Sequence, residues 1–317
     1  MNIKKSLIAL SITSLVFSAE LIAEPYAFIT NQIDNSVSVV DIDNNKVIKA
    51  IEVSGKPVGV AVNPKNSQVY ISTPEGNGFT VIDADKMAVI NKVKVGGASL
   101  GIVSDVNGQR VFVADWYENT VSVFETKNFN LIKTITVGKS PSGMAVSPDN
   151  RWLYVANRMD DSISQIDLKT LRIRNTTKVG AHPFGLTVDS KGEKLYSANV
   201  ESNDVSVLDA INLKRLAIVK SGSRPYASAL ALNDSRLFVT NQDDSTVSVI
   251  DTASLKEIAQ IEVGEKPEGI STAPNDKHIY VANWEDSTVS VIDAETLKVI
   301  KTIKTGEGSR AFGLFIR

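Results

Sequence analysis

The chain contains no cysteine and only two histidines, His182 and His278, among its 317 residues. Disulfides are therefore excluded. The usual zinc, copper and haem ligand sets draw on several histidines or cysteines, so we expect no metal site and no cofactor. The sequence also lacks a Gly-x-Ser-x-Gly elbow and a phosphate-binding loop. Consequently we assign no catalytic residue.

The chain also lacks an excess of positive charge. Its net charge is −2 and its pI is about 5.8. Binding to nucleic acid depends on a dense basic face that neutralises phosphates, so net charge disfavours nucleic acid as a partner without excluding it. No apolar run approaches the roughly 20 residues needed to span a bilayer, and we expect no membrane insertion.

The N-terminus has the composition of a secretory signal peptide. Two lysines precede an apolar run, residues 7–17, and the small residues Ala19 and Ala23 offer cleavage sites. We expect residues 1–23 to be the signal peptide and residues 24–317 to be one exported domain. For a protein without cysteine, the bacterial periplasm is the expected location.

A pattern of 42 residues repeats seven times along the rest of the chain. Each copy holds an aromatic, a small polar and an acidic residue in constant register, which is the signature of a repeat architecture. We expect the acidic residue that ends each third strand, such as Asp293, to cap its own turn. The aromatic positions are Phe28, Tyr70, Phe112, Tyr154, Tyr196, Phe238 and Tyr280.

Each copy contains four short runs of β-branched and aromatic residues, separated by turn residues. Four-stranded antiparallel sheets repeated around an axis form an all-β fold, and seven of them predict a seven-bladed β-propeller. The chain starts within a repeat and ends on a first strand, residues 312–316. We expect this C-terminal inner strand to close the ring with three N-terminal strands, which would remove two exposed edges.

Three of the predicted second strands resemble a known motif. Residues 153–157, 279–283 and 238–241 read Leu-Tyr-Val-Ala-Asn, Ile-Tyr-Val-Ala-Asn and Phe-Val-Thr-Asn, and they resemble the motif of the YVTN β-propeller family. The resemblance covers essentially the whole exported domain. It implies a seven-bladed propeller of the kind found in surface antigens, stand-alone periplasmic proteins and subunits of quinone-dependent amine dehydrogenases. It also implies that the Pro-x-Gly strand lies innermost.

Loops alternate between two faces in an up-and-down meander. The loops that enter the innermost strands and the loops between second and third strands therefore share one face, which we call the mouth of the central channel. Four cations and one histidine occur at the position before the prolines of the entry loops. Like charges around such a mouth attract anions. The ring consists of Lys56, Ala98, Ser140, His182, Arg224, Lys266 and Arg310.

A second ring, two residues further along each chain segment, mixes aromatic residues with one acid, which we expect to pair with Lys266 or Arg310. The loops between second and third strands add indole and guanidinium groups. Aromatic and arginine side chains on one face are typical of binding surfaces. From the second ring we select Phe184, Tyr226, Glu268 and Phe312, and from the loops Trp116, Arg158 and Trp284. The predicted ligand site adds Lys56, His182, Arg224, Lys266 and Arg310.

Several functions remain open at this point. We expect a non-catalytic exported binding or scaffold protein, with an anionic small molecule or an acidic protein partner at the mouth. The alternatives are an accessory propeller subunit of a periplasmic quinone-dependent dehydrogenase, a lactonase-like hydrolase and a nucleic-acid-binding propeller. A hydrolase would need a carboxylate cluster or a general base at the mouth, and Glu268 is the only acid in the two rings.

Overall fold

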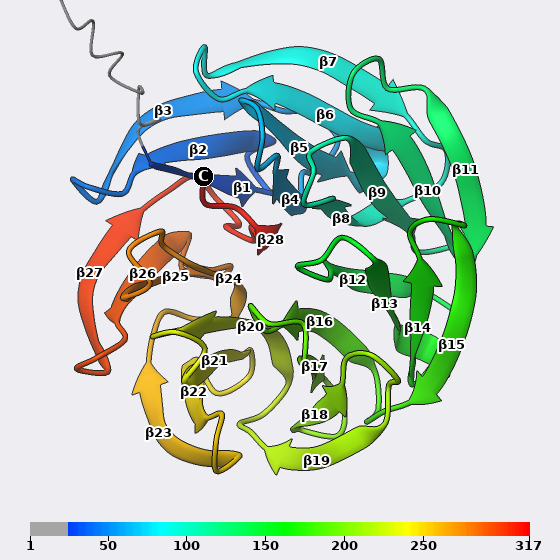
Figure 1. The fold of residues 1–317 in the computed structure, drawn as a ribbon. Helices are drawn as coiled ribbons and strands as arrows, with labels where there is room; N and C mark the ends of the chain where they lie inside the picture. The colour runs from blue at the N-terminus through cyan, green and yellow to red at the C-terminus, as the bar shows by residue number, and fades with distance from the viewer. Residues whose placement is uncertain (1–24) are drawn as a thin grey trace, which may run out of the picture.

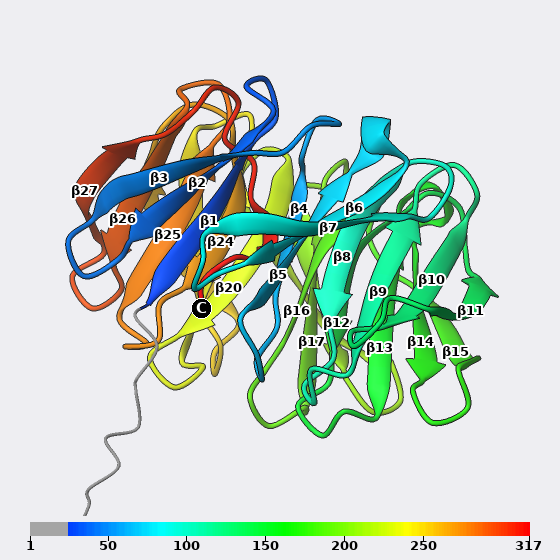
Figure 2. The same ribbon diagram turned by 90° about the horizontal axis from the view of Figure 1, so that it is seen from above.

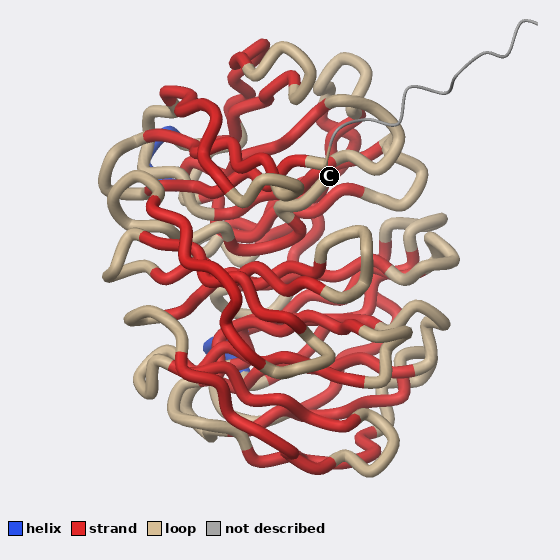
Figure 3. Tube along the Cα trace, turned by 90° about the vertical axis from the view of Figure 1, so that its left-hand side faces the viewer, coloured by secondary structure: helices blue, strands red, loops and turns tan. Residues whose placement is uncertain are grey.

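The computed structural model describes residues 25–317, so the expected signal peptide lies outside the described residues. Seven β-sheets surround a central channel (Figure 1). This confirms the predicted all-β, seven-bladed propeller with antiparallel four-stranded blades. The two helical elements of the described residues are single 3₁₀ turns, η1 (Pro74–Gly76) and η2 (Arg158–Asp160), which are blue in Figure 3. Within residues 25–317 no helix is long and apolar enough to cross a membrane.

The strands of each blade follow one another outward from the channel, and Figure 2 shows them running between the two faces of the ring. The innermost strands are β4 (Gly59–Val62), β8 (Ser99–Ser104), β12 (Pro141–Val146), β16 (Pro183–Val188), β20 (Pro225–Ala231), β24 (Pro267–Thr272) and β28 (Phe312–Leu314). The second strands are β1 (Tyr26–Asn31), β5 (Gln68–Thr73), β9 (Arg110–Asp115), β13 (Trp152–Asn157), β17 (Lys194–Asn199), β21 (Arg236–Asn241) and β25 (His278–Asn283). The third strands are β2 (Ser36–Asp41), β6 (Gly78–Asp83), β10 (Thr120–Glu125), β14 (Ser162–Asp167), β18 (Asp204–Asp209), β22 (Thr246–Asp251) and β26 (Thr288–Asp293). The outermost strands are β3 (Lys46–Glu52), β7 (Ala88–Lys94), β11 (Leu131–Thr136), β15 (Arg172–Lys178), β19 (Arg215–Lys220), β23 (Lys256–Glu262) and β27 (Lys298–Lys304).

The C-terminal segment closes the ring against the N-terminal blade, as expected. The backbone N–H of Arg310 donates to the carbonyl of Thr30 at 2.9 Å, and that of Phe28 donates to the carbonyl of Phe315 at 2.8 Å. Between these two points β28 turns toward the next blade and pairs in parallel with β4. Gly313, with φ of 117°, permits this departure from a regular inner strand.

The third strands are rich in serine and threonine because a buried asparagine lies beside them in most blades. The side-chain amide of Asn157 donates to Ser162 at 3.1 Å and to Ser164 at 2.9 Å. Asn241 and Asn283 make the same pair of bonds in their blades. These bonds satisfy polar groups inside a core whose seven aromatic residues are almost fully buried.

The acidic residue after most third strands caps its turn, as expected. The carboxylate of Asp167 accepts the backbone N–H groups of Lys169 and Thr170 at 2.9 and 2.8 Å. Asp293 accepts those of Glu295 and Thr296 at 3.0 and 2.7 Å. These hydrogen bonds hold the pKa of Asp167 and the pKa of Asp293 below the usual value for aspartate.

Glycine on the innermost strands lets neighbouring blades approach closely around the channel. A Cβ atom on Gly143 would lie 2.1 Å from the carbonyl oxygen of Phe184 in the next blade. A Cβ atom on Gly101 would lie 1.9 Å from the carbonyl oxygen of Ser142. The Pro-x-Gly strand therefore lies innermost, as the resemblance to YVTN propellers implies.

Candidate functional site

The entry loops at the mouth share one backbone conformation. Lys56, Ser140, His182, Arg224 and Lys266 all have φ between 51° and 56°. In four of these loops the backbone N–H donates to a side-chain oxygen of the preceding blade at 2.8–2.9 Å. The bonds fix the loops relative to their neighbours, so the predicted ring positions do lie together. The four acceptors are Asn35, Asn119, Asp161 and Asn203.

Cations and carboxylates alternate along one side of the mouth. Arg224 Nη1 lies 2.8 Å from Glu201 Oε1, and Arg224 Nε lies 3.7 Å from Asp243 Oδ2. Lys266 Nζ lies 2.8 Å from Asp243 Oδ1, and His182 Nδ1 lies 3.8 Å from Glu201 Oε1. We call these five side chains the mouth belt. The expected ring of like charges is therefore largely neutralised on this side.

The two carboxylates of the mouth belt, Glu201 and Asp243, are not among the predicted site residues. Glu201 and Asp243 follow their second strands by two residues and lie 42 residues apart. Glu75 and Glu285 occupy the same position in two other copies. These acidic positions form a further series with the 42-residue spacing. The sequence therefore contains the signal that places acids beside the cationic ring.

Arg310 lies in a buried polar cluster beneath the mouth. Its Nη2 donates to Glu268 Oε1 and to the Tyr226 hydroxyl, each at 3.0 Å, and its Nη1 donates to Gln32 Oε1 at 3.1 Å. Gln242 Nε2 donates to the same carboxylate at 2.8 Å. Glu268 is thus an ion-pair partner of Arg310, one of the two cations expected. Burial opposes the charge on Arg310, but Glu268 outweighs burial and keeps the pKa of this guanidinium high.

An aromatic plug formed by Phe184, Tyr226 and Phe312 closes the channel under the mouth. The ring centroids of Phe184 and Tyr226 lie 4.0 Å apart, and those of Phe184 and Phe312 lie 4.8 Å apart. All three side chains are buried. Burial, followed by the charge of Glu268, raises the pKa of Tyr226. Four predicted contact residues, these three and Glu268, therefore lie below the surface and support the mouth from beneath.

Arg158, on η2, lies over the edge of this plug without an ion pair. Its guanidinium carbon is 5.3 Å from the ring centroid of Trp116 and 5.7 Å from that of Phe184. Burial lowers the pKa of Arg158, and the nearby charge of Arg224 acts in the same direction, while Tyr226 and Glu201 oppose this shift. A partly desolvated guanidinium beside another cation favours the arrival of an anion.

Three buried nitrogen atoms at the mouth have no hydrogen-bond partner among the described residues. They are Arg158 Nε, His182 Nδ1 and Trp284 Nε1. Lys56, the remaining predicted cation, donates to the carbonyl of Ile33 at 3.3 Å. The mouth thus combines two unpaired donors, on Arg158 and Trp284, with indole faces.

The opposite end of the channel holds a cavity of about 460 Å³. None of the predicted ligand-site residues except Phe312 lines it. We call it the channel cavity. Phe312 of the plug forms its inner end. The second histidine, His278, lies on this side of the molecule and contacts Asn275 at 3.1 Å through Nδ1. The plug therefore separates two different environments, a polar mouth and an apolar cavity.

Carboxylates do not gather into a metal-binding group in the part of the chain that the structure describes. No group of three or more histidine, cysteine, aspartate or glutamate side chains suited to holding a metal ion occurs within residues 25–317. Glu201 and Asp243 are engaged by cations of the mouth belt. The carboxylate cluster that a metal-dependent hydrolase would use is not assembled by these residues.

Two family models match the sequence. The model described as "Cytochrome D1 heme domain" matches residues 22–146 and 198–310, which is more than half of the chain. The model described as "Lactonase, 7-bladed beta-propeller" matches residues 130–212. A search among curated proteins gives no match.

Similar solved structures share the propeller fold at low sequence identity. Hydrazine synthase of Kuenenia stuttgartiensis has a TM-score of 0.77 and 20% identity, covering 84% of this chain and 91% of that one. A functionally unknown protein from Desulfotomaculum acetoxidans DSM 771 has a TM-score of 0.78 and 14% identity, covering 91% and 99%. Dihydro-heme d1 dehydrogenase NirN in complex with DHE has a TM-score of 0.68 and 13% identity, covering 92% and 74%. At these identities the likeness extends to the fold alone.

Proposed function

The chain belongs to the cytochrome D1 heme domain family, and from this premise we propose that it binds a tetrapyrrole of the d1-haem class at the mouth of its channel. The observation that carries the proposal is that Arg158 and Trp284, each with a side-chain nitrogen that has no hydrogen-bond partner within residues 25–317, lie at the mouth with the partly exposed imidazole of His182. An unsatisfied buried donor costs about 1–3 kcal/mol. A ligand that carries carboxylate groups would supply the missing acceptors.

The residues at the mouth have the chemistry that a haem requires. A single imidazole is sufficient as the proximal ligand of a haem iron. His182 has a side chain that is 31% exposed, and its Nδ1 faces Glu201 at 3.8 Å. Metal-bound histidines commonly direct their second ring nitrogen to a carboxylate. Ligation through one imidazole would not need the several histidines or cysteines on which the expectation of no cofactor rests.

The remaining predicted residues suit the rest of such a ligand. Arg158 and Lys56 carry charges that no carboxylate neutralises within 4.0 Å in the described chain, and they would hold acidic side groups of the ring. Trp116 and Trp284 offer flat apolar faces. When bound, the haem supplies iron-centred redox chemistry, and the residues of the chain bind and orient it. This proposal departs from the expectation of no cofactor. It keeps the expectation of an anionic small molecule at the mouth and identifies that molecule as a tetrapyrrole.

The other functions have less support. The lactonase model matches only residues 130–212, and a nucleic acid would have to bind cations that Glu201, Asp243 and Glu268 already neutralise. No feature of the described residues singles out a docking surface for a dehydrogenase or an acidic protein. In this proposal the protein is a periplasmic, non-catalytic binding protein whose repeats are of the YVTN type.

The proposal is tested by titrating the haem-free protein with haemin and following the Soret band. We expect saturable binding with the spectral shift of imidazole ligation. His182→Ala should lose that shift but still bind metal-free protoporphyrin IX, whereas Arg158→Gln should weaken binding of both by about tenfold, because it removes a charged hydrogen-bond donor.

The matched control is His278→Ala, which alters the other histidine on the opposite face. It should behave as the unaltered protein does. An unchanged spectrum in His182→Ala, or equal loss in both histidine variants, would contradict the proposed axial ligand. Absence of saturable binding to either porphyrin would contradict the proposal as a whole.

A further inference from the structure

The channel cavity is built from inner strands of all seven blades, and these strands encircle the channel in Figure 1. Its inner end is closed by Phe312, which is 6% exposed, and its outer end opens beside Val106 and Leu314, which are 36% and 65% exposed. A volume of about 460 Å³ lies within the range of roughly 300–1,000 Å³ that small-molecule sites occupy. One ring of its lining recurs every 42 residues: Ile102, Met144, Leu186, Ser228 and Ile270.

The charge of the channel cavity differs from that of the mouth. Among residues 25–317, no lysine, arginine or histidine lines it. Two carboxylates, Asp105 and Asp234, lie at its rim. Asp234 accepts the backbone N–H of Ser190 at 2.8 Å. An anion would therefore enter without a counter-charge and at a cost in desolvation.

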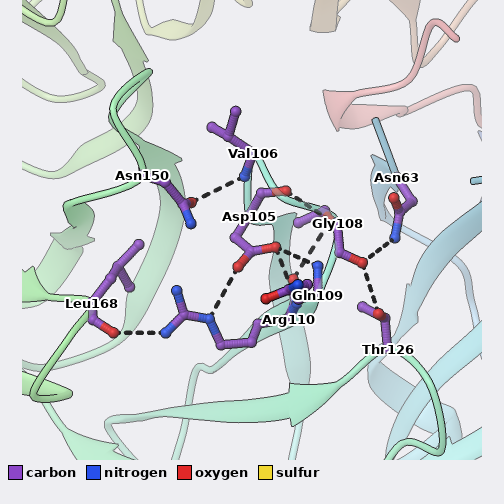
Figure 4. A network of polar contacts seen from close by, with 10 residues as sticks. Asn63, Asp105, Val106, Gly108, Gln109, Arg110, Thr126, Asn150 and Leu168 are labelled. Atoms are coloured by element: carbon purple, nitrogen blue, oxygen red, sulfur yellow. Dashed lines mark hydrogen bonds and ion pairs between the residues drawn. The ribbon is translucent and has the colours of Figure 1, made fainter. Parts of the chain in front are cut away.

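Asp105 is fully engaged by its own loop, as Figure 4 shows. Its Oδ1 accepts the backbone N–H groups of Gln109 and Arg110 at 2.7 and 3.0 Å. Its Oδ2 accepts Nε of Arg110 at 3.0 Å. The carboxylate is thus neutralised and leaves little attraction for a cationic ligand.

The same network makes the rim rigid across neighbouring blades (Figure 4). Arg110 Nη1 donates to the carbonyl of Leu168 at 2.7 Å, and the backbone N–H of Val106 donates to Asn150 at 3.1 Å. On the other side Asn63 Nδ2 donates to the carbonyl of Gly108 at 3.0 Å. Because these bonds join three blades, the cavity entrance is preformed, which reduces the entropy cost of binding.

One hydroxyl interrupts the apolar ring. Thr187 donates its hydroxyl proton to the carbonyl of Ser228 at 2.7 Å. Its Oγ1 lies 2.9 Å from Ser228 Oγ and, with its own proton committed, accepts the Ser228 proton. The Ser228 oxygen then has lone pairs free for a donor. The channel cavity therefore combines a mainly apolar wall with a hydrogen-bond acceptor at Ser228, on the ring of inner-strand side chains.

We infer that the channel cavity is a second ligand site, which takes an uncharged, mainly apolar molecule with one hydrogen-bond donor, such as an aromatic amine or a phenol. The site is independent of the mouth because the aromatic plug lies between them. It does not rest on tetrapyrrole binding.

Two fluorescent probes test this inference because they differ in one sulfonate group. N-phenyl-1-naphthylamine is uncharged, and 1-anilinonaphthalene-8-sulfonate is its anionic analogue. We expect the uncharged probe to bind saturably and the sulfonate to bind at least tenfold more weakly. Leu186→Trp, which fills the cavity, should abolish binding of the uncharged probe, and Ser228→Ala should weaken it about three- to tenfold, as the loss of one hydrogen bond implies.

The matched control is Leu216→Trp, on β19 at the outside of the same blade, where the side chain is 50% exposed. Its binding of the uncharged probe should equal that of the unaltered protein. Equal binding of the two probes, or unchanged binding of the uncharged probe in Leu186→Trp, would overturn the inference. Ser228→Ala keeps the inference testable if the tryptophan variant does not fold.

Discussion

Arg310 and Glu268 form a buried ion pair across the closure between the first and the last blade. Nη2 of Arg310 lies 3.0 Å from Oε1 of Glu268, and the two side chains are 18% and 3% exposed. Arg310 precedes β28, and Glu268 lies on β24. The pair thus joins the C-terminal segment to its neighbour in the ring and supports the mouth from below.

Removing one partner of this pair should cost more than removing both. Glu268→Leu leaves a buried guanidinium without a counter-charge, and we expect the free energy of unfolding to fall by about 3–5 kcal/mol. The double variant Arg310→Met with Glu268→Leu should lose less than the single variant. Urea denaturation measures both. Additive losses would mean that the two side chains do not interact energetically.

The closing segment should be necessary for a monomeric fold. Phe315 is fully buried, so Phe315→Ala should lower the free energy of unfolding by about 3–5 kcal/mol. Deleting residues 309–317 should also expose the edge of β1 and promote association. Thermal melting and size-exclusion chromatography report the two effects. A truncated protein that stays monomeric with an unchanged melting temperature would refute this role of the segment.

Arg158 should lower the stability of the free protein. Its Nε is buried without a partner, which costs about 1–3 kcal/mol, and its stacking on Trp116 returns only about 0.5–1 kcal/mol. We therefore expect Arg158→Leu to raise the free energy of unfolding by about 1 kcal/mol, by chemical denaturation, while weakening haemin binding. A clear loss of stability would assign this arginine to the fold instead.

Acid should destabilise the turns at the ends of the third strands. Hydrogen bonds to the carboxylates lower the pKa of Asp167, Asp251 and Asp293 in the folded state. Their contribution is therefore complete above the unfolded aspartate value of about 3.9 and is lost as pH falls through the lower folded value. Melting temperatures should fall below about pH 4. The double variant Asp167→Asn with Asp293→Asn should show a shallower fall, and an identical acid profile would argue against these carboxylates.

Much of the fold could be predicted because its determinants recur at constant spacing. The aromatic positions that mark the repeat, from Phe28 to Tyr280, are all buried, and the C-terminal segment bonds to β1 as expected. The parallel pairing of β28 with β4 could not be predicted in this way. It depends on the local geometry at Gly313, after a two-residue insertion that breaks the register of the repeat.

The site was harder to predict because pairing and depth are tertiary properties. Sequence alone did not reveal that Arg310 of the cationic ring lies beneath the mouth or that Asp243 joins Arg224 and Lys266. The channel cavity was missed for a different reason. The predicted site was built from loop positions alone. The inner-strand series from Ile102 to Ile270, which lines the cavity, has the same 42-residue spacing but was not included.

The mouth belt also determines how a ligand arrives. Its alternating charges, from His182 and Glu201 to Asp243 and Lys266, cancel one another over a few ångströms. Such a field does not reach beyond the first layers of water, so it provides little electrostatic steering. Association then lacks the increase in rate that complementary charges would give. An anion therefore reaches the mouth by ordinary diffusion, and its affinity is governed by how slowly it leaves.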